Sequence, residues 1–157
     1  MDARDRPNRI PWPPILLVAT LAFAIALQWL APLPWIYGFA ALEATALGLT
    51  MIVAAFAIDI WAALVFRSHK TTIMPHQAST RLVTRGPLRF SRNPIYVGNL
   101  MVVAGLGLVL SNPWLLIATP VLGFALHKLA IRREERHMEA LFGDQWRDYR
   151  TRVRRWI

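Results

Sequence analysis

The chain has 157 residues, of which 55% are hydrophobic and 17% are charged, and it contains no cysteine. A soluble domain carries about a quarter charged residues, whereas here the apolar residues gather in unbroken blocks of about twenty. This composition excludes a disordered chain, a disulfide scaffold and cysteine catalysis. The 18 Lys and Arg against 9 Asp and Glu lie beside the apolar blocks, which favours an anionic lipid surface over nucleic acid.

Four apolar blocks predict an all-α, polytopic integral membrane protein that forms one domain over residues 1–157. The predicted transmembrane helices cover about residues 15–33, 38–66, 94–110 and 113–130. We expect the first block to be a membrane anchor and not a signal peptide, because no small-residue cleavage site follows it. The last two blocks each open with a proline, which is tolerated at the first position of a helix, and form a helical hairpin.

The basic residues predict the orientation in the membrane. Three arginines precede the first block, six Lys and Arg lie in the loop 67–93, and nine follow the fourth block, whereas the two opposite turns have none. The positive-inside rule therefore predicts that both termini, the loop and the tail 131–157 are cytoplasmic. We expect a bacterial inner membrane protein.

The tail contains a stop signal for one helix and a start signal for another. Gly143 is typical of a helix end, and Asp144 of the N-cap of the next helix. Aromatic and apolar residues then recur at helical spacing among five arginines. This pattern predicts a C-terminal helix that lies in the membrane interface.

Two acidic residues, Glu134 and Glu135, stand where the fourth helix leaves the membrane. They lie about 100 degrees apart on a helix, so they could clasp a cationic or polyhydroxyl ligand against an apolar patch. A charge-balanced helix exit beside Arg132, Arg133 and Arg136 is an equally good interpretation.

The segment RGPLRFSRNPIYVG, residues 85–98, combines a turn with a helix start at Pro94. Unpaired backbone amides at a helix start favour an anion, and the arginines at 85, 89 and 92 would reinforce this preference. The same arginines could instead bind lipid headgroups.

Within the apolar blocks, Glu43 can reach the outer surface, whereas Asp59 lies about two turns below the inner one. Asp59 is therefore a candidate functional residue, although a structural hydrogen bond is an alternative. Glycines in the third block are typical of close helix packing. The four histidines show no metal-ligand spacing, so we predict no metal site.

The run TTIMPHQASTRLVTRGPLRFSRNPIYVG, an apolar hairpin and the ending IRREERHMEALFGDQWRDYRTRVRRWI together resemble the isoprenylcysteine carboxyl methyltransferase and phospholipid methyltransferase superfamily. The likeness covers about residues 66–157. It rests on a G-P-x-R-x-x-R-[HN]-P-x-Y-x-G run, an E-E pair and an F-G-x-x-[WY]-x-x-Y ending, in that order.

The resemblance implies methyl transfer from S-adenosylmethionine at the cytoplasmic membrane face. The cofactor-binding residues that it implies are Arg92, Asn93, Pro94, Tyr96, Gly98, Gly105, Glu134 and Glu135. Arg92 is also a predicted catalytic residue. Many carboxyl methyltransferases have histidine where this chain has Asn93, so prenylcysteine is less favoured as the substrate.

The expected partners are membrane lipids and a lipophilic or small membrane-permeable methyl acceptor, with carboxylate O-methylation as the family default. Methylation of an amine or thiol releases a proton, for which His76 or Asp59 are candidate bases. Phospholipid N-methylation is the alternative enzyme activity. A non-enzymatic basic membrane protein that binds anionic lipid or a partner is the alternative from another class.

Overall fold

The computed structural model describes residues 10–35, 39–68 and 82–157, and every regular element within these ranges is helical. The expected all-α fold is therefore confirmed. The elements are α1 (Trp12–Leu30), α2 (Phe39–Ser68), η1 (Gly86–Arg89), α3 (Pro94–Val109), α4 (Pro113–Leu126), η2 (His127–Ile131), α5 (Arg132–Phe142) and α6 (Asp144–Arg152).

The hairpin between α3 and α4 forms where its prolines predict it. Pro94 and Pro113 each occupy the first position of their helix. A backbone N–H at this position would have no acceptor within the helix, so its absence in proline costs no hydrogen bond. The side chain of Asn112 accepts hydrogen bonds from the amides of Trp114 and Leu115, at 3.0 and 3.3 Å. This cap stabilises the start of α4.

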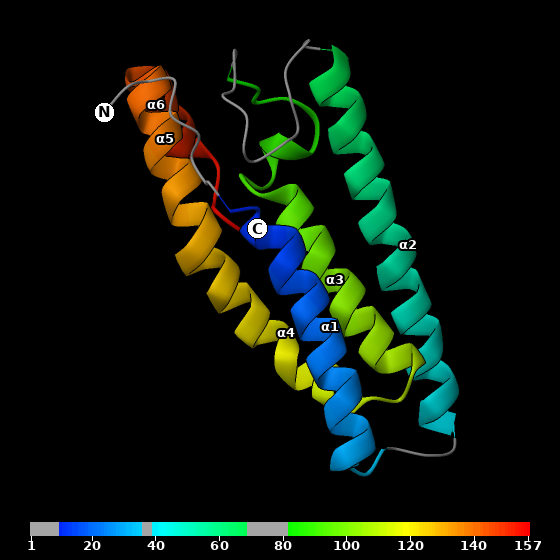
Figure 1. Cartoon of the computed structure of the whole chain (residues 1–157). Coiled ribbons are helices and arrows are strands. Elements are labelled where there is room, and N and C mark those ends of the chain that lie inside the picture. The colour runs from blue at the N-terminus through cyan, green and yellow to red at the C-terminus, as the bar shows by residue number, and fades with distance from the viewer. Residues whose placement is uncertain (1–9, 36–38, 69–81) are drawn as a thin grey trace.

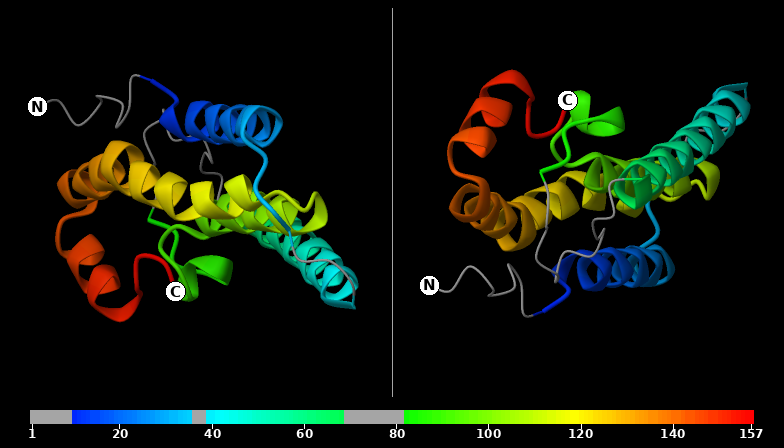
Figure 2. Two further views of the ribbon diagram at one scale, coloured as in Figure 1. Left: turned by 90° about the horizontal axis from the view of Figure 1, so that it is seen from below. Right: turned by 90° about the horizontal axis from the view of Figure 1, so that it is seen from above.

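The helices pack in the order α2, α3, α4, α1, so that α1 and α2 lie on opposite sides of the hairpin although they are consecutive in the chain (Figures 1 and 2). The short helices at the chain's C-terminal end return towards η1 and the start of α3. This return brings the C-terminal motif to the motif before α3 at one end of the helix row.

The contact between α2 and α3 depends on a pair of glycines. A Cβ atom placed on Gly105 would lie 2.7 Å from the carbonyl oxygen of Gly48, and one placed on Gly48 would lie 2.6 Å from the carbonyl oxygen of Gly105. At this distance a side chain at either position would have to displace the backbone of the other helix, which is energetically costly. The close helix packing expected of the glycines in the third block is thus observed.

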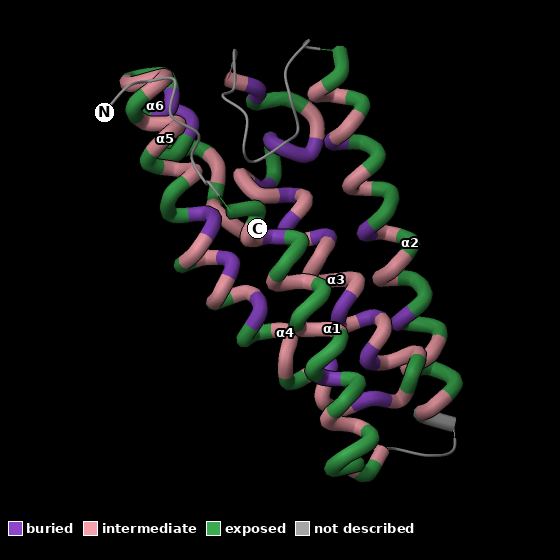
Figure 3. Tube along the Cα trace, viewed as in Figure 1, coloured by how far each residue is buried: buried purple, intermediate pink, exposed green. Residues whose placement is uncertain are grey.

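Exposed residues lie beside buried ones along all of the long helices (Figure 3), and many of the exposed residues are large and apolar. Val103, Leu115 and Leu122 are at most 2% exposed and belong to the central cluster. Val18, Val53 and Phe124 point outward, and each is more than 60% exposed. An apolar surface of this extent is typical of a protein that is surrounded by lipid.

Among the residues that the structure describes, three helical stretches are long and apolar enough to cross a membrane: Trp12–Leu30, Ala41–Ser68 and Pro113–Phe142. The last includes α4, η2 and α5, which form one continuous helix that ends before Gly143, where the sequence predicts a helix stop. Helix α3 has 16 residues, about 24 Å, which is shorter than a hydrocarbon core of about 30 Å. The fourth span thus stays a prediction.

Helix α6 starts at Asp144, directly after Gly143 with its positive φ of 49°. The sequence therefore located this helix boundary, but Gly143 and not Asp144 is the N-cap, and Asp144 is the first residue of the helix. However, Trp146 and Tyr149 are only 4% exposed and pack within the protein. The expectation that this aromatic face lies in the membrane interface is wrong for these two residues, because η1 and the start of α3 cover them.

Candidate functional site

A cavity of about 570 Å³ lies where the start of α3 meets the first turn of α1, the end of α2 and the start of α5. The predicted cofactor-binding residues that line it are Arg92, Asn93, Pro94, Tyr96 and Glu134. Most of the remaining wall is apolar and comes from helices that the resemblance did not cover. The cavity thus combines a polar end with an apolar wall.

At the polar end, the Tyr96 hydroxyl donates a hydrogen bond to Oε1 of Glu134 at 2.7 Å. Tyr96 is 8% exposed and projects from the first turn of α3, whereas Glu134 projects from the first turn of α5. The bond orients the Glu134 carboxylate at the cavity wall. Glu134 therefore faces the helix start that the sequence paired with it.

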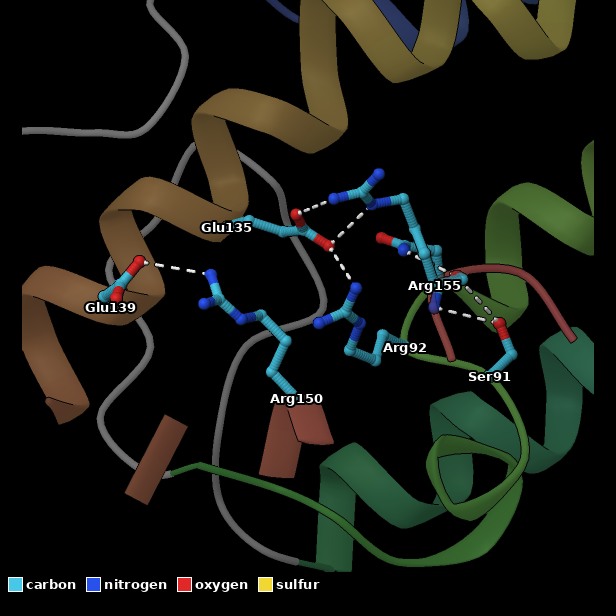
Figure 4. A network of polar contacts seen from close by, with 7 residues as sticks. Ser91, Arg92, Glu135, Glu139, Arg150 and Arg155 are labelled. Carbon is cyan, nitrogen blue, oxygen red and sulfur yellow. Dashed lines mark hydrogen bonds and ion pairs between the residues drawn. The ribbon is translucent and has the colours of Figure 1, made fainter. Parts of the chain in front are cut away.

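Glu135 points to a different set of partners (Figure 4). Its Oε1 lies 3.1 Å from Nη2 of Arg92. Arg155 binds the same carboxylate with two nitrogens, Nε at 3.0 Å and Nη2 at 2.7 Å. The two glutamates thus act separately: Glu134 faces the cavity, and Glu135 joins α5 to the start of α3 and to the C-terminal tail.

Arg92 is the most enclosed cation of the site, with a side chain that is 7% exposed. Its guanidinium lies 5.8 Å from the centre of the Trp146 ring, within cation–π range. Burial lowers the pKa of Arg92, and Glu135 opposes this effect, so the group stays charged. Its Nε and Nη1 have no hydrogen-bond partner among the described residues.

The C-terminal tail holds the start of α3 through backbone groups. The carbonyl of Arg154 accepts a bond from the amide of Arg92 at 3.0 Å, and the carbonyl of Arg155 accepts one from Nδ2 of Asn93 at 2.9 Å. The amide of Asn93 donates to Oγ of Ser91 at 3.1 Å. Asn93 thus has a structural role beside the cavity, which the sequence did not indicate.

Helix α6 supports the segment before α3. The Tyr149 hydroxyl donates to the carbonyl of Leu88 at 2.7 Å, and burial raises the pKa of Tyr149. Trp146 contacts both the Tyr149 ring and Arg92. The aromatic residues of the predicted F-G-x-x-W-x-x-Y ending therefore position the cavity's arginine.

Several predicted site residues do not line the cavity. Gly98 packs against Asp59, whose Oδ1 would lie 2.8 Å from a Cβ at position 98, and Gly105 packs against Gly48. Asp59 Oδ1 has no hydrogen-bond partner among the described residues. His76 falls outside the described residues. These glycines therefore act at the α2–α3 interface and not in the cavity wall.

The sequence did not predict several contributors to the site, among them Arg155, Ser91, Phe66 and Asn99. Arg155 and Ser91 act through bonds between distant chain segments, and the sequence contains no pattern that pairs them. Phe66 and Asn99 line the cavity from α2 and α3. Asn99 directly follows the motif. Because it lies about one helical turn after Tyr96, the sequence could have indicated that both residues face the cavity.

Comparisons with known proteins identify the family of the chain. The model of the phospholipid methyltransferase family matches residues 44–145. A nickel-cobalt-cadmium resistance protein, NccN, of Alcaligenes xylosoxydans xylosoxydans is 34% identical over 94 residues, which are 60% of this chain and 40% of that protein. An uncharacterized protein of Haemophilus influenzae is 30% identical over 63 residues, 40% of this chain and its own whole length. No solved structure matches.

Helices long and apolar enough to cross a bilayer are typical of an integral membrane protein. The chain belongs to the phospholipid methyltransferase family. Membership implies a membrane methyltransferase. The chain spans only 40% of the length of NccN, so nothing about that protein's resistance function transfers directly.

Proposed function

We propose that the chain uses S-adenosylmethionine to methylate a lipophilic acceptor at the cytoplasmic face of a bacterial inner membrane, with both termini on that face. The observation that carries the proposal is the position of Arg92 and Glu134. The buried guanidinium has two donors without partners, and the carboxylate borders the same cavity. A buried polar group without a partner calls for an explanation, and a bound anionic group supplies one.

The residues at the cavity fit the chemistry of this cofactor. Its carboxylate matches the free donors of Arg92, since guanidinium and carboxylate form charge-assisted bonds. Its ammonium or ribose hydroxyls match Glu134, which Tyr96 already orients. The first amides of α3 add donors, because Asn93 gives that helix no side-chain cap. A volume of about 570 Å³ is ordinary for a small-molecule pocket.

Bound S-adenosylmethionine supplies a methyl group on a sulfonium. The protein's part is to align the acceptor with the carbon–sulfur bond and to exclude water, which together contribute much of the rate in such displacements. Held by Arg92 and Glu134, the cofactor would supply its methyl group to the acceptor's electron pair, and the electrons of the carbon–sulfur bond would stay on sulfur. A carboxylate acceptor needs no base, whereas an amine must release a proton.

The apolar wall of the cavity suits an acceptor that enters from the bilayer. Leu17, Phe66 and Leu88 supply this wall from α1, α2 and η1. Carboxylate O-methylation is the first candidate reaction. The family's description favours a second candidate, N-methylation of an aminophospholipid. Lipid extracts of cells grown with deuterated methionine, with and without the protein, distinguish the two by the labelled product.

Calorimetric titration of the detergent-purified protein with S-adenosylmethionine, or with its demethylated product, tests the proposal. We expect saturable binding that Glu134→Gln weakens at least about tenfold. Asp148→Asn removes a carboxylate from the exposed face of α6 and is expected to leave binding unchanged. The alternative of a non-enzymatic basic membrane protein predicts no heat with any variant, and that result from folded protein would falsify the enzyme assignment.

A further inference from the structure

A second cavity, about 430 Å³ in volume, lies between the η2–α5 helix and the C-terminal segment. We call it the basic groove, because six of its lining residues are cationic. These are Lys128, Arg132, Arg133, Arg136, Arg150 and Arg155. Two carboxylates, Glu135 and Glu139, also line it.

The carboxylates of the basic groove are already engaged (Figure 4). Glu135 is bound by Arg155, and Oε2 of Glu139 lies 3.5 Å from Nη1 of Arg150. Within the described part of the chain, Lys128, Arg132 and Arg133 form no ion pair. The groove therefore has uncompensated positive charge, which the fold does not use to hold itself together.

An exposed apolar stripe leads along the helix to the basic groove. Ile117, Val121 and Phe124 are 51%, 63% and 63% exposed and follow one another at helical spacing. Lys128 comes four residues after Phe124, and its Nζ lies 5.4 Å from the centre of that ring. A lipid chain against this stripe would place its headgroup beside Lys128 and Arg132.

We propose that the basic groove binds the phosphate group of an anionic phospholipid of the cytoplasmic leaflet. An arginine guanidinium donates two parallel hydrogen bonds to the oxygens of a phosphate, and a lysine adds a further positive charge. The apolar stripe supplies the second element of recognition, since it meets the acyl chain of the same molecule. This site is separate from the cavity of Tyr96 and Glu134, and its occupation does not depend on methyl transfer.

Native mass spectrometry of the full chain, released from micelles with equal amounts of phosphatidylglycerol and phosphatidylcholine, tests the proposal. We expect one phosphatidylglycerol to remain bound in preference to phosphatidylcholine. The double variant Arg132→Gln, Arg133→Gln is expected to lower this retention at least about tenfold, since each basic residue near an anionic surface contributes a factor of about five. If it does not fold, Lys128→Gln with Arg136→Gln takes its place.

The matched control is Arg147→Gln with Arg152→Gln, which removes the same net charge from the exposed face of α6. An unchanged retention of phosphatidylglycerol in the control supports a specific groove. An equal loss in both double variants, or equal retention of the two lipids, overturns it. Displacement of phosphatidylglycerol by millimolar inorganic phosphate overturns the lipid assignment. Because no cofactor is present, these results are independent of the proposed methyl transfer.

Discussion

Arg92 and Glu135 form an enclosed ion pair between the start of α3 and α5, with Nη2 and Oε1 3.1 Å apart and side chains 7% and 12% exposed. The two residues come from separate motifs of the chain. Arg155 of the tail binds the same carboxylate. One glutamate therefore fixes the relative positions of three segments, of which the start of α3 and α5 line the proposed cofactor cavity.

Replacing Glu135 with Gln is expected to destabilise the fold. The variant keeps the side-chain volume but leaves two guanidinium groups without their counter-charge, and breaking an enclosed pair costs about 3 to 5 kcal/mol. Thermal unfolding in detergent, followed by circular dichroism, measures the effect. Asp148→Asn breaks an exposed pair and should change stability by about 0.5 kcal/mol or less. Equal midpoints for the two variants would contradict the role of Glu135.

Replacing Tyr96 with Phe is expected to weaken cofactor binding about tenfold. The change removes the donor to Glu134, and a hydrogen bond to a charged group is worth about 1.5 to 3 kcal/mol. Calorimetric titration with the demethylated cofactor product measures the affinity. Thr119→Val, which removes a hydroxyl inside α4, is the control. Wild-type affinity in the Tyr96 variant would argue against a cofactor next to Glu134.

Replacing Gly105 with Ala is expected to destabilise the α2–α3 contact by about 1 to 3 kcal/mol, because the new methyl group meets the backbone of Gly48 at 2.7 Å. The matched control is Gly123→Ala, whose methyl group meets only the end of the Leu100 side chain at 3.4 Å. Thermal midpoints of the two variants test the difference. If Gly123→Ala lost as much stability as Gly105→Ala, the close contact between residues 105 and 48 would not explain the loss.

Replacing Tyr149 with Phe is expected to change how stability depends on alkaline pH. Burial raises the pKa of Tyr149 more than Arg92 lowers it, so the folded state holds the phenol proton more tightly than the unfolded state, whose pKa is about 10. The stabilisation from Tyr149 is therefore complete below about pH 10 and is lost as the pH rises further.

Unfolding of wild type and of Tyr149→Phe at pH 8 and at pH 10.5 measures this effect. At pH 8 the variant should be less stable by about 1 kcal/mol, because it lacks the bond to the Leu88 carbonyl. At pH 10.5 the two proteins should differ less. A gap that stays constant between the two pH values would contradict the burial argument.

Local signals in the sequence located the helices well. Pro94, Pro113 and Gly143 marked real helix boundaries, because proline and glycine act through the backbone of their own residue. The fourth helix continues past the predicted end of its membrane span at 130 and ends before Gly143, as that glycine predicted. The predicted position of Trp146 and Tyr149 in the membrane interface was wrong. Helical spacing shows that one face of a helix is apolar, but it does not show whether lipid or protein covers that face.

The sequence by itself determined the class of protein: apolar blocks must avoid water, and the motif residues are specific enough to indicate the methyltransferase family. Only the tertiary structure decided that Glu134 and Glu135 have different partners, and that the C-terminal tail binds the start of α3. Helix geometry fixes the angle between neighbouring side chains, but the partners come from distant segments. Their meeting depends on how whole helices pack, which no local pattern encodes.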